Sequence, residues 1–309
     1  MTPLEIIRLV LICIVTLVNF FFVIDLLNRR KDIKACEEII KKNSLTFYKA
    51  FSKITNRRKR EAVYAVYAFC RYADDLIDED QDETGLNALE EELKHYIQGE
   101  KPQSFRFRAL KQTTSHYYPK NYDYKPYFDM IKGQRMDLDF KGYQTEKELL
   151  EYCYDVAGTV GLMLLPILSE THDKELDAFA VNLGYAMQIT NILRDIGEDE
   201  RNGRIYLPED AFRKANYSKD DLHHGKINIE FINMFESFAK KAEGYYEQAL
   251  DDLKLFPDDV KLPLGLSIVL YRGIIDACRE SNYDVFTKKN FVSEDKKNEL
   301  IQSFLKSMK

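Results

Sequence analysis

The chain has 309 residues, of which 45% are hydrophobic and 31% charged, so it can bury the core of one large domain or of two smaller ones. Its 45 lysines and arginines against 51 aspartates and glutamates give a net charge of −6, which argues against nucleic acid as a partner because phosphate backbones bind basic surfaces. The five cysteines are scattered without CxxC spacing. They indicate reduced thiols rather than a disulfide framework or a zinc site.

The N-terminal segment has the length and composition of a membrane-spanning helix. Residues Leu9–Ile24 are almost entirely apolar, and the flanks extend this stretch to Ile6–Leu27, about the ~20 residues that cross a bilayer. The basic cluster Arg29–Lys31 follows directly, so the positive-inside rule places the remaining chain in the cytoplasm. A cleaved signal peptide fits less well, because the basic cluster stands on the wrong side of the apolar stretch.

We therefore expect residues 1–30 to anchor the protein at the cytoplasmic face of the cell membrane as a single-pass helix. A buried N-terminal helix and a misassigned start codon are the alternatives.

Residues 31–309 read as one all-α domain. Apolar residues recur at spacings of three and four, and glycine and proline mostly mark the ends of segments. Neither a flexible linker nor a solenoid repeat divides the region. The expected helices are Ile33–Phe51, Arg57–Asp80, Gly85–Ile97, Phe105–Tyr117, Tyr124–Lys132, Glu146–Ser169, Lys174–Glu200, Ile229–Leu255, Pro263–Ser281 and Ser293–Ser307.

The expected helix Arg57–Asp80 carries a polar, largely acidic face. This face is formed by Tyr67, Arg71, Asp74 and Asp78. Their spacings of four, three and four place them on one side of a helix, and an apolar, aromatic stretch leads directly into them. A single acidic pair of this kind is common on solvated helix surfaces, so the face is informative only together with a second one.

That second face lies on the expected helix Lys174–Glu200. It is formed by Gln188, Asn191, Asp195 and Asp199, at spacings of three, four and four. Carboxylate and amide oxygens are ligands that suit Mg²⁺, and two such rows can face each other across the interior of a helical bundle. The arginines Arg194, Arg201 and Arg204 could hold the phosphate groups of a metal-bound ligand.

A di-iron centre is the other common use of paired carboxylates in a bundle. That centre requires Glu-x-x-His motifs, which this sequence lacks. We read the five histidines, which lie outside both rows, as surface or loop residues. The doubled pattern therefore favours Mg²⁺ bound together with a phosphorylated ligand.

With these pieces in order, the chain resembles the squalene/phytoene synthase family, whose members condense two prenyl diphosphates head to head. The resemblance covers about residues 34–295. Its most specific parts are Tyr67-x-x-x-Arg71-x-x-Asp74-Asp75-x-x-Asp78 and the run from Gln188 through Asp199 to Gly203-Arg-Ile-Tyr-Leu-Pro208. Supporting parts are Ser44-x-Thr46-Phe47, Met136-Asp137-Leu138 and Ala157-Gly158-Thr159-Val160-Gly161. Within the family, the bacterial dehydrosqualene synthases are the most similar.

The resemblance implies an isoprenoid-synthase helical bundle and a role for each motif residue. It implies Mg²⁺ ions held by Asp74, Asp78, Asn191, Asp195 and Asp199. It implies catalytic roles for Asp74, Asp78, Asp195, Asp199, Arg71, Arg194 and Tyr67. It implies contacts to the prenyl diphosphates from Asn43, Ser44, Leu45, Thr46, Tyr67, Arg71, Tyr152, Gln188, Arg194, Tyr206 and Tyr271. The chain departs from the family at Leu45, where relatives often have a lysine that Lys42 or Lys49 would have to replace.

The implied reaction joins two farnesyl diphosphates through presqualene diphosphate to dehydrosqualene (C30), which a carotenoid desaturase would then use. The allylic cation formed on the way is quenched by water, so the reaction needs a dry chamber with aromatic faces. We expect this chamber to be lined by Phe47, Phe51, Tyr64, Val156, Val160, Leu164, Leu183 and Met187.

Phytoene synthase, which joins two C20 diphosphates, and squalene synthase, which adds hydride from NADPH, are alternatives within the family. A terpene cyclase shares the aspartate-rich pattern but is not expected to have the Gly203–Pro208 run. A non-enzymatic alternative is an inactive helical membrane partner. The sequence disfavours it, because no acidic ligand of either row is lost.

Overall fold

A computed structural model describes residues 2–78, 81–171 and 173–308, and these ranges contain helices and no strands. The helices are α1 (Pro3–Asn43), α2 (Leu45–Phe51), α3 (Arg57–Asp78), α4 (Glu83–Ile97), α5 (Phe105–Thr114), α6 (Lys125–Met136), α7 (Glu146–Cys153), α8 (Thr159–Leu168), α9 (Lys174–Arg201), α10 (Glu209–Ala215), α11 (Lys219–His223), α12 (Ile229–Asp251), α13 (Asp258–Glu280) and α14 (Glu294–Ser307). Two short turns complete them, the π-helical η1 (Tyr154–Gly158) and the 3₁₀-helical η2 (Asp252–Leu255). The predicted all-α fold is confirmed.

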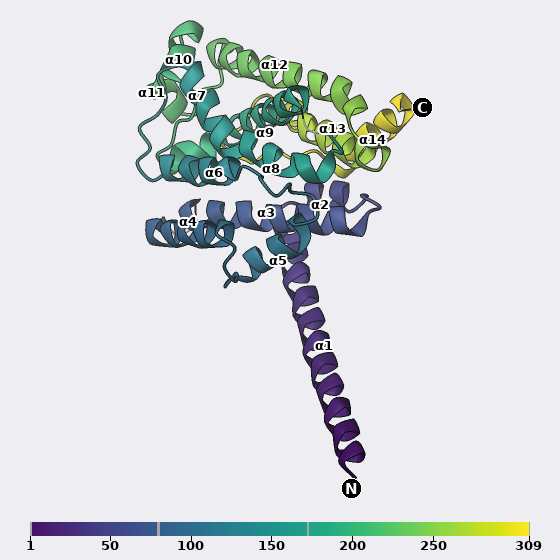
Figure 1. The fold of residues 1–309 in the computed structure, drawn as a ribbon. Helices are drawn as coiled ribbons and strands as arrows, with labels where there is room; N and C mark the ends of the chain where they lie inside the picture. Colours follow the sequence, from purple (N-terminus) through teal and green to yellow (C-terminus); the bar gives the residue numbers. More distant parts are fainter. Residues whose placement is uncertain (1, 79–80, 172, 309) are drawn as a thin grey trace.

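Helix α1 projects far out of the helical body (Figure 1). Its large apolar side chains between Ile7 and Leu27 are 37–63% exposed, so most of this part is not packed against the described residues of the body. The apolar window within Ile7–Asn43 has a mean hydropathy of 2.7, and by length and composition the helix can cross a membrane. The segment Glu146–Leu168 is also long and apolar enough to cross a membrane. However, 44% of its apolar window is buried inside the protein, which is typical of a core helix.

The body places α8 between the two helices that carry the polar rows. Helix α8 packs against both α3 and α9, and α9 packs in turn against α12 and α13. Figure 1 shows α3, α4 and α5 as a layer on the side of α1, with α6 and α8 above it and α12 on the opposite side. The two rows thus lie on neighbouring layers of one bundle.

Several predicted helix limits are wrong. The segment Ile33–Phe51 is not one helix, because the chain leaves helical geometry at Ser44 (φ −145°), which becomes the N-cap residue of α2. The helix expected at Glu146–Ser169 is interrupted by η1. Helix α13 begins at Asp258, and Pro263 lies inside it rather than at its start. Helices α10 and α11 were not predicted, being too short to show a periodic pattern.

The cysteines and histidines lie where the sequence predicts. Four cysteines are buried and free, Cys36, Cys70, Cys153 and Cys278, whereas Cys13 is exposed on α1. The histidines His95, His116, His223 and His224 are exposed. His172 and the predicted helix end at Asp80 lie outside the described residues.

Helix α9 approaches the η1 turn most closely at Gly184. A Cβ atom at this position would lie 2.5 Å from the Cα and N atoms of Gly158, which is closer than real side-chain contacts. Gly161 on α8 approaches α9 in the same way, since its Cβ would lie 2.7 Å from the carbonyl oxygen of Ala180. The small residues of this segment therefore allow close packing of two backbones.

We expect Gly184→Ala to lower the free energy of unfolding by about 1–3 kcal/mol, because the added methyl group forces α9 away from η1. The matched control is Gly244→Ala on the exposed side of α12, where nothing lies within 4 Å. That change is expected to raise stability by about 0.5–1 kcal/mol through helix propensity. Urea unfolding of both variants in mild detergent measures the difference, and equal stabilities would contradict the close approach.

Candidate functional site

The α3 row lies on the side of α3 that the core leaves open. Tyr67, Arg71 and Asp74 are half-buried and Asp78 is exposed, whereas the opposite side of the helix is buried. Arg71 lies 3.5 Å from Asp74 through Nη1 and Oδ2, and it also pairs with Asp75. The predicted helical face is thus formed, with one guanidinium between two carboxylates.

Asp74 carries more negative charge than its surroundings balance. Its Oδ1 accepts a hydrogen bond from Nε2 of Gln134 on α6, at 3.1 Å. Even so, desolvation by the crowded protein environment and the nearby carboxylate of Asp78 raise the pKa of Asp74 to about 7, despite the opposing effects of Arg71 and Gln134. A cation near this carboxylate would restore its ordinary charged form.

The α9 row is ordered by contacts along the helix and from α13. Tyr271 donates from its hydroxyl to Oδ1 of Asn191 at 2.8 Å, and Asn191 donates to Oε1 of Gln188 at 3.4 Å. Arg194 holds both carboxylate oxygens of Asp195, at 2.8 and 2.5 Å. Lys289, from the loop after α13, lies 3.2 Å from the same carboxylate.

Asp199 stands at the end of the α9 row. Among the described residues, no hydrogen bond or ion pair to its carboxylate is found. Burial, together with the charges of Asp195 and Glu198, raises the pKa of Asp199 to about 8. A cavity of about 10 Å³, lined in part by Asp199, Arg204 and Tyr206, lies beside it and is about large enough for one water molecule.

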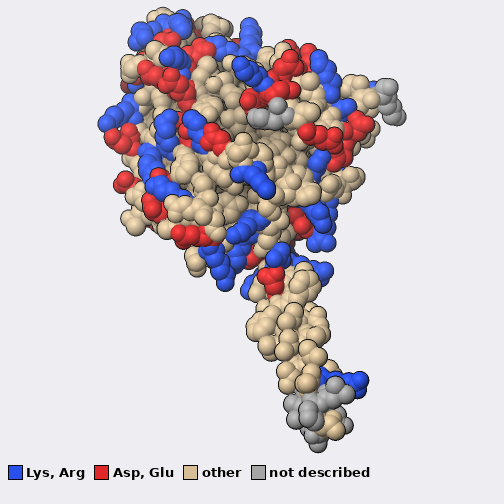
Figure 2. Space-filling view, in the orientation of Figure 1, with Lys and Arg blue, Asp and Glu red and all other residues tan. Residues whose placement is uncertain are grey.

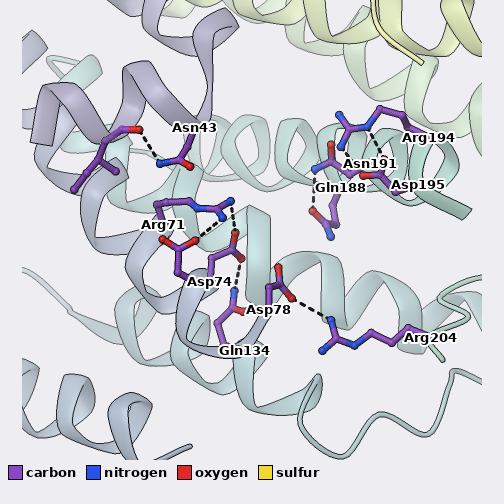
Figure 3. A network of polar contacts seen from close by, with 12 residues as sticks. Asn43, Arg71, Asp74, Asp78, Gln134, Gln188, Asn191, Arg194, Asp195 and Arg204 are labelled. Atoms are coloured by element: carbon purple, nitrogen blue, oxygen red, sulfur yellow. Dashed lines mark hydrogen bonds and ion pairs between the residues drawn. The ribbon is translucent and has the colours of Figure 1, made fainter. Parts of the chain in front are cut away.

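Arg204 joins the two rows. Helix α9 ends in a Schellman motif, in which Gly203 has φ +76° and the backbone N–H of Arg204 donates to the carbonyl of Asp199 at 2.8 Å. This turn directs the Arg204 side chain back across the site, where Nη1 donates to Oδ1 of Asp78 at 3.0 Å (Figure 3). The run Gly203–Pro208 thus has a geometric role, because its glycine permits the positive φ that aims the arginine.

A buried carboxylate below Arg204 holds two of the predicted substrate contacts. Asp137 accepts hydrogen bonds from the hydroxyl groups of Tyr152, at 2.9 Å, and Tyr206, at 3.0 Å. Burial raises the pKa of Asp137 to about 6, against the opposing effect of these hydrogen bonds. Both tyrosines therefore lie beside the site with their hydroxyl groups directed to Asp137.

The segment Asn43–Thr46 connects α1 to α2 at the edge of the site. Asn43 donates to the carbonyl of Ile39 at 3.0 Å, and Leu45 is 50% exposed. The next residue, Phe47, stacks on the ring of Tyr271 with centroids 5.3 Å apart, which brings the segment next to the α9 row. Lys49, one of two lysines considered as a substitute phosphate ligand, lies 4.0 Å from Glu294 instead.

Figure 3 shows Arg71, Asp74 and Asp78 of the α3 row near Gln188, Asn191 and Asp195 of the α9 row, with Arg204 reaching Asp78. Two participants were missed. Gln134 lies in a short helix with no diagnostic spacing, and Lys289 reaches Asp195 from a loop 94 positions further along the chain. Asp137 was noted only as part of a motif, and nothing in its spacing reveals that it holds two tyrosines.

The residues present fit divalent cations that arrive with an anion. The donors are carboxylate and amide oxygens, which suit Mg²⁺. Within the described chain, no group of three or more histidine, cysteine or acidic side chains is close enough to form a metal cage by itself. Mg²⁺ is commonly held by one or two carboxylates together with substrate phosphates, and the uncompensated charge at Asp74 and Asp199 matches that arrangement.

Comparisons with known proteins identify relatives of this chain. The family model described as squalene/phytoene synthase matches residues 40–295. The chain is 38% identical over 272 residues to 15-cis-phytoene synthase of Synechococcus elongatus, covering 83% of this chain and 87% of that protein. It is 32% identical over 280 residues to 4,4'-diapophytoene synthase of Staphylococcus haemolyticus, covering 89% and 96%. A crystal structure of a dehydrosqualene synthase in complex with a ligand superimposes with a TM-score of 0.85 at 41% identity, covering 91% and 97%.

The raised pKa values predict how stability depends on pH. In the metal-free protein, Asp74 and Asp199 bind protons more tightly when folded than at their ordinary pKa of 3.8. Their contribution to stability is therefore complete below about pH 4 and is lost as the pH rises through about 7 and 8. Mg²⁺ with inorganic diphosphate competes with these protons, so we expect it to raise the melting temperature more at about pH 8 than at about pH 6.

The control is the double variant Asp74→Asn/Asp199→Asn, which keeps the shape of both side chains and removes their titration. Its stability is expected to change less with pH than that of the wild-type protein. A wild-type response to Mg²⁺ and diphosphate that is the same at both pH values would contradict the assignment.

Proposed function

The chain belongs to the squalene/phytoene synthase family of prenyltransferases, which condense prenyl diphosphates head to head, and on that premise we propose that it joins two farnesyl diphosphates to dehydrosqualene (C30). The observation that carries the proposal is the pair of oxygen-rich rows on α3 and α9, linked by Arg204. The C15 substrate is supported by the likeness to proteins named 4,4'-diapophytoene synthase and dehydrosqualene synthase.

We assign the metal-binding role to the two rows. In this proposal Mg²⁺ is held by Asp74, Asp78, Asn191, Asp195 and Asp199. When bound, Mg²⁺ neutralises the diphosphate and makes it a better leaving group. The raised pKa values of Asp74 and Asp199 support this role, because a cation bound beside them would favour the charged form that their surroundings disfavour.

The cationic side chains of the site are placed to bind diphosphate oxygens. Arg71, Arg194 and Arg204 contact row carboxylates, and a guanidinium can bind carboxylate and phosphate oxygens at the same time. They would stabilise the negative charge that develops on the departing diphosphate. Tyr67 and Gln188 lie on the same faces, and we assign them to substrate contact.

An apolar strip on η1 and α8 supports a dry chamber for the prenyl chains. Val156 in η1 and Val160 and Leu164 in α8 recur every four residues and are half-exposed, although α8 packs against α3, α6 and α9. All three side chains pack against the hydrophobic core, and Val156 also approaches Gly133 on α6. Met187 on α9 and Phe47 on α2 are half-exposed as well. Such a surface excludes the water that would quench an allylic cation, and the aromatic ring offers a π face to it.

The length of the prenyl substrate separates the proposed function from a second candidate, phytoene synthase. Phe51 and Tyr64 are 6% and 2% exposed, so each is held tightly in the core, and Phe51 stacks with Phe47 at 5.9 Å. Bulky, buried rings at this end of the proposed chamber would leave no room for the five additional carbons of a C20 chain. The 38% identity to a 15-cis-phytoene synthase favours the alternative, condensation of two C20 diphosphates.

We further propose that residues 1–30 anchor the chain in the cell membrane and that residues 31–309 form the catalytic domain on its cytoplasmic face. The exposed apolar side chains of α1 support the anchor, and the basic residues Arg29–Lys31 support the orientation. The hydrocarbon product would enter the same bilayer, where a carotenoid desaturase is the expected next enzyme.

The full chain with Mg²⁺ and farnesyl diphosphate is expected to form a C30 hydrocarbon without NADPH. Mass analysis of extracts, with farnesyl and geranylgeranyl diphosphate supplied together, measures the choice. Exclusive formation of a C40 product would replace our proposal with phytoene synthase. A C30 product that requires NADPH would indicate squalene synthase instead.

The substitution Asp195→Asn is expected to reduce turnover by at least about 100-fold, because it removes a metal-binding charge at the leaving group. The matched control is Asp251→Asn, at an exposed position at the end of α12, and it should keep wild-type turnover. Circular dichroism of both variants checks that the fold is retained. Undiminished turnover of folded Asp195→Asn would refute the two-row site.

A further inference from the structure

A wide groove lies where α1 enters the body. Its volume is about 930 Å³, and α1, the start of α3 and the end of α5 line it. Its basic residues are Arg29, Arg30, Lys34, Arg57 and Arg58, against the two carboxylates of Glu37 and Glu61. The groove therefore has a net charge of +3 with its histidine neutral, on a chain whose net charge is −6. Figure 2 shows lysine and arginine side chains gathered around the base of the projecting helix.

We call this site the basal groove. Both of its carboxylates already have partners: Glu61 accepts from Arg57 at 2.6 Å, and Glu37 accepts from the hydroxyl of Tyr48 at 3.2 Å. Arg30, Lys34 and Arg58 are exposed, and in the described part of the chain no hydrogen bond or ion pair of their side chains is found. These three cations remain available to an anionic ligand.

The groove begins where the apolar part of α1 ends. The stretch from Ile7 to Leu27 is about 30 Å long, at ~1.5 Å per residue, which equals the hydrocarbon thickness of a bilayer. Leu26, near the end of that stretch, lines the groove together with Ile33. A membrane spanned by α1 would therefore place the groove at the level of the lipid headgroups.

The position of the groove relative to α1 is fixed by the body. Asp32, which is only 5% exposed, accepts hydrogen bonds from Nε and Nη2 of Arg108 on α5, both at 2.9 Å. Helix α1 continues without a break to Asn43, and it packs against α3 and α5. The groove is thus part of the folded body and does not depend on a mobile linker.

We propose that the basal groove binds the phosphate headgroup of an anionic phospholipid, a step that rests on the proposed anchoring of α1. Arginine binds phosphate oxygens through paired N–H groups, and Leu26 and Ile33 offer apolar contacts for the start of an acyl chain. Each basic residue close to an anionic membrane surface raises affinity by a factor of about five. Headgroup binding at this site holds the catalytic body against the bilayer.

The test uses the full chain in mild detergent, mixed with equal amounts of phosphatidylglycerol and phosphatidylcholine, and counts retained lipids by native mass spectrometry. The wild-type protein is expected to retain phosphatidylglycerol with a preference of at least about ten-fold. The triple variant Arg30→Ala/Lys34→Ala/Arg58→Ala should lose most of that preference. The control Arg213→Ala/Lys240→Ala/Lys306→Ala removes the same charge from exposed positions on α10, α12 and α14 and should keep it.

Equal retention of the two lipids by the wild-type protein would overturn the proposal, and this comparison needs no variant. Equal losses in the two triple variants would also overturn it, because the effect would then come from net charge. Displacement of the lipid by millimolar inorganic phosphate would identify free phosphate as the ligand instead. Product formation is assayed on the same samples, so a failure of the proposed reaction is seen separately from a failure of lipid retention.

Discussion

The arrangement of the site depends on how the negative charge of the carboxylates on α3 and α9 is balanced. Two helices direct carboxylates into a shared space, and the cations within reach are tied to particular members of the rows. The charged form is most disfavoured at Asp74 and Asp199, where burial and neighbouring carboxylates raise the pKa to about 7 and about 8. In the proposed function, Mg²⁺ would supply the balancing positive charge together with the diphosphate substrate, and the arginines of the site would then contact its phosphates.

The contacts around these rows explain how a loop and a short helix contribute to a bundle site. Gly203 permits the left-handed turn that ends α9, and this turn carries Arg204 to Asp78 on the other row. Tyr206, two residues after Arg204, donates a hydrogen bond to Asp137, and so does Tyr152 from α7. A short run of the chain thus closes the site on one side, with Arg204 bound to Asp78 and to the carbonyl of Asp137, and Tyr206 bound to the carboxylate of Asp137.

Helical periodicity was sufficient to predict the fold class and both rows, because residues three or four apart must share a face once the helix forms. It could not predict Gln134 or Lys289, since their approach to Asp74 and Asp195 depends on how α6 and the loop after α13 pack. Nor could it predict the break at Ser44 or the π-helical turn at Tyr154–Gly158, which interrupt segments whose composition suits a continuous helix. Such features arise from tertiary packing, as at Gly184, where two backbones meet without intervening side chains.

The unbroken course of α1 has a mechanical consequence. The helix runs from Pro3 to Asn43, is clamped to the body through Asp32 and Arg108, and ends beside Phe47, which stacks on Tyr271. A rigid rod of this kind transmits its tilt directly to the attached body. Bilayers of different thickness impose different tilts on a spanning helix. With α1 spanning the membrane as proposed, the body and its two rows would then turn relative to the lipid surface as the surrounding membrane thins or thickens.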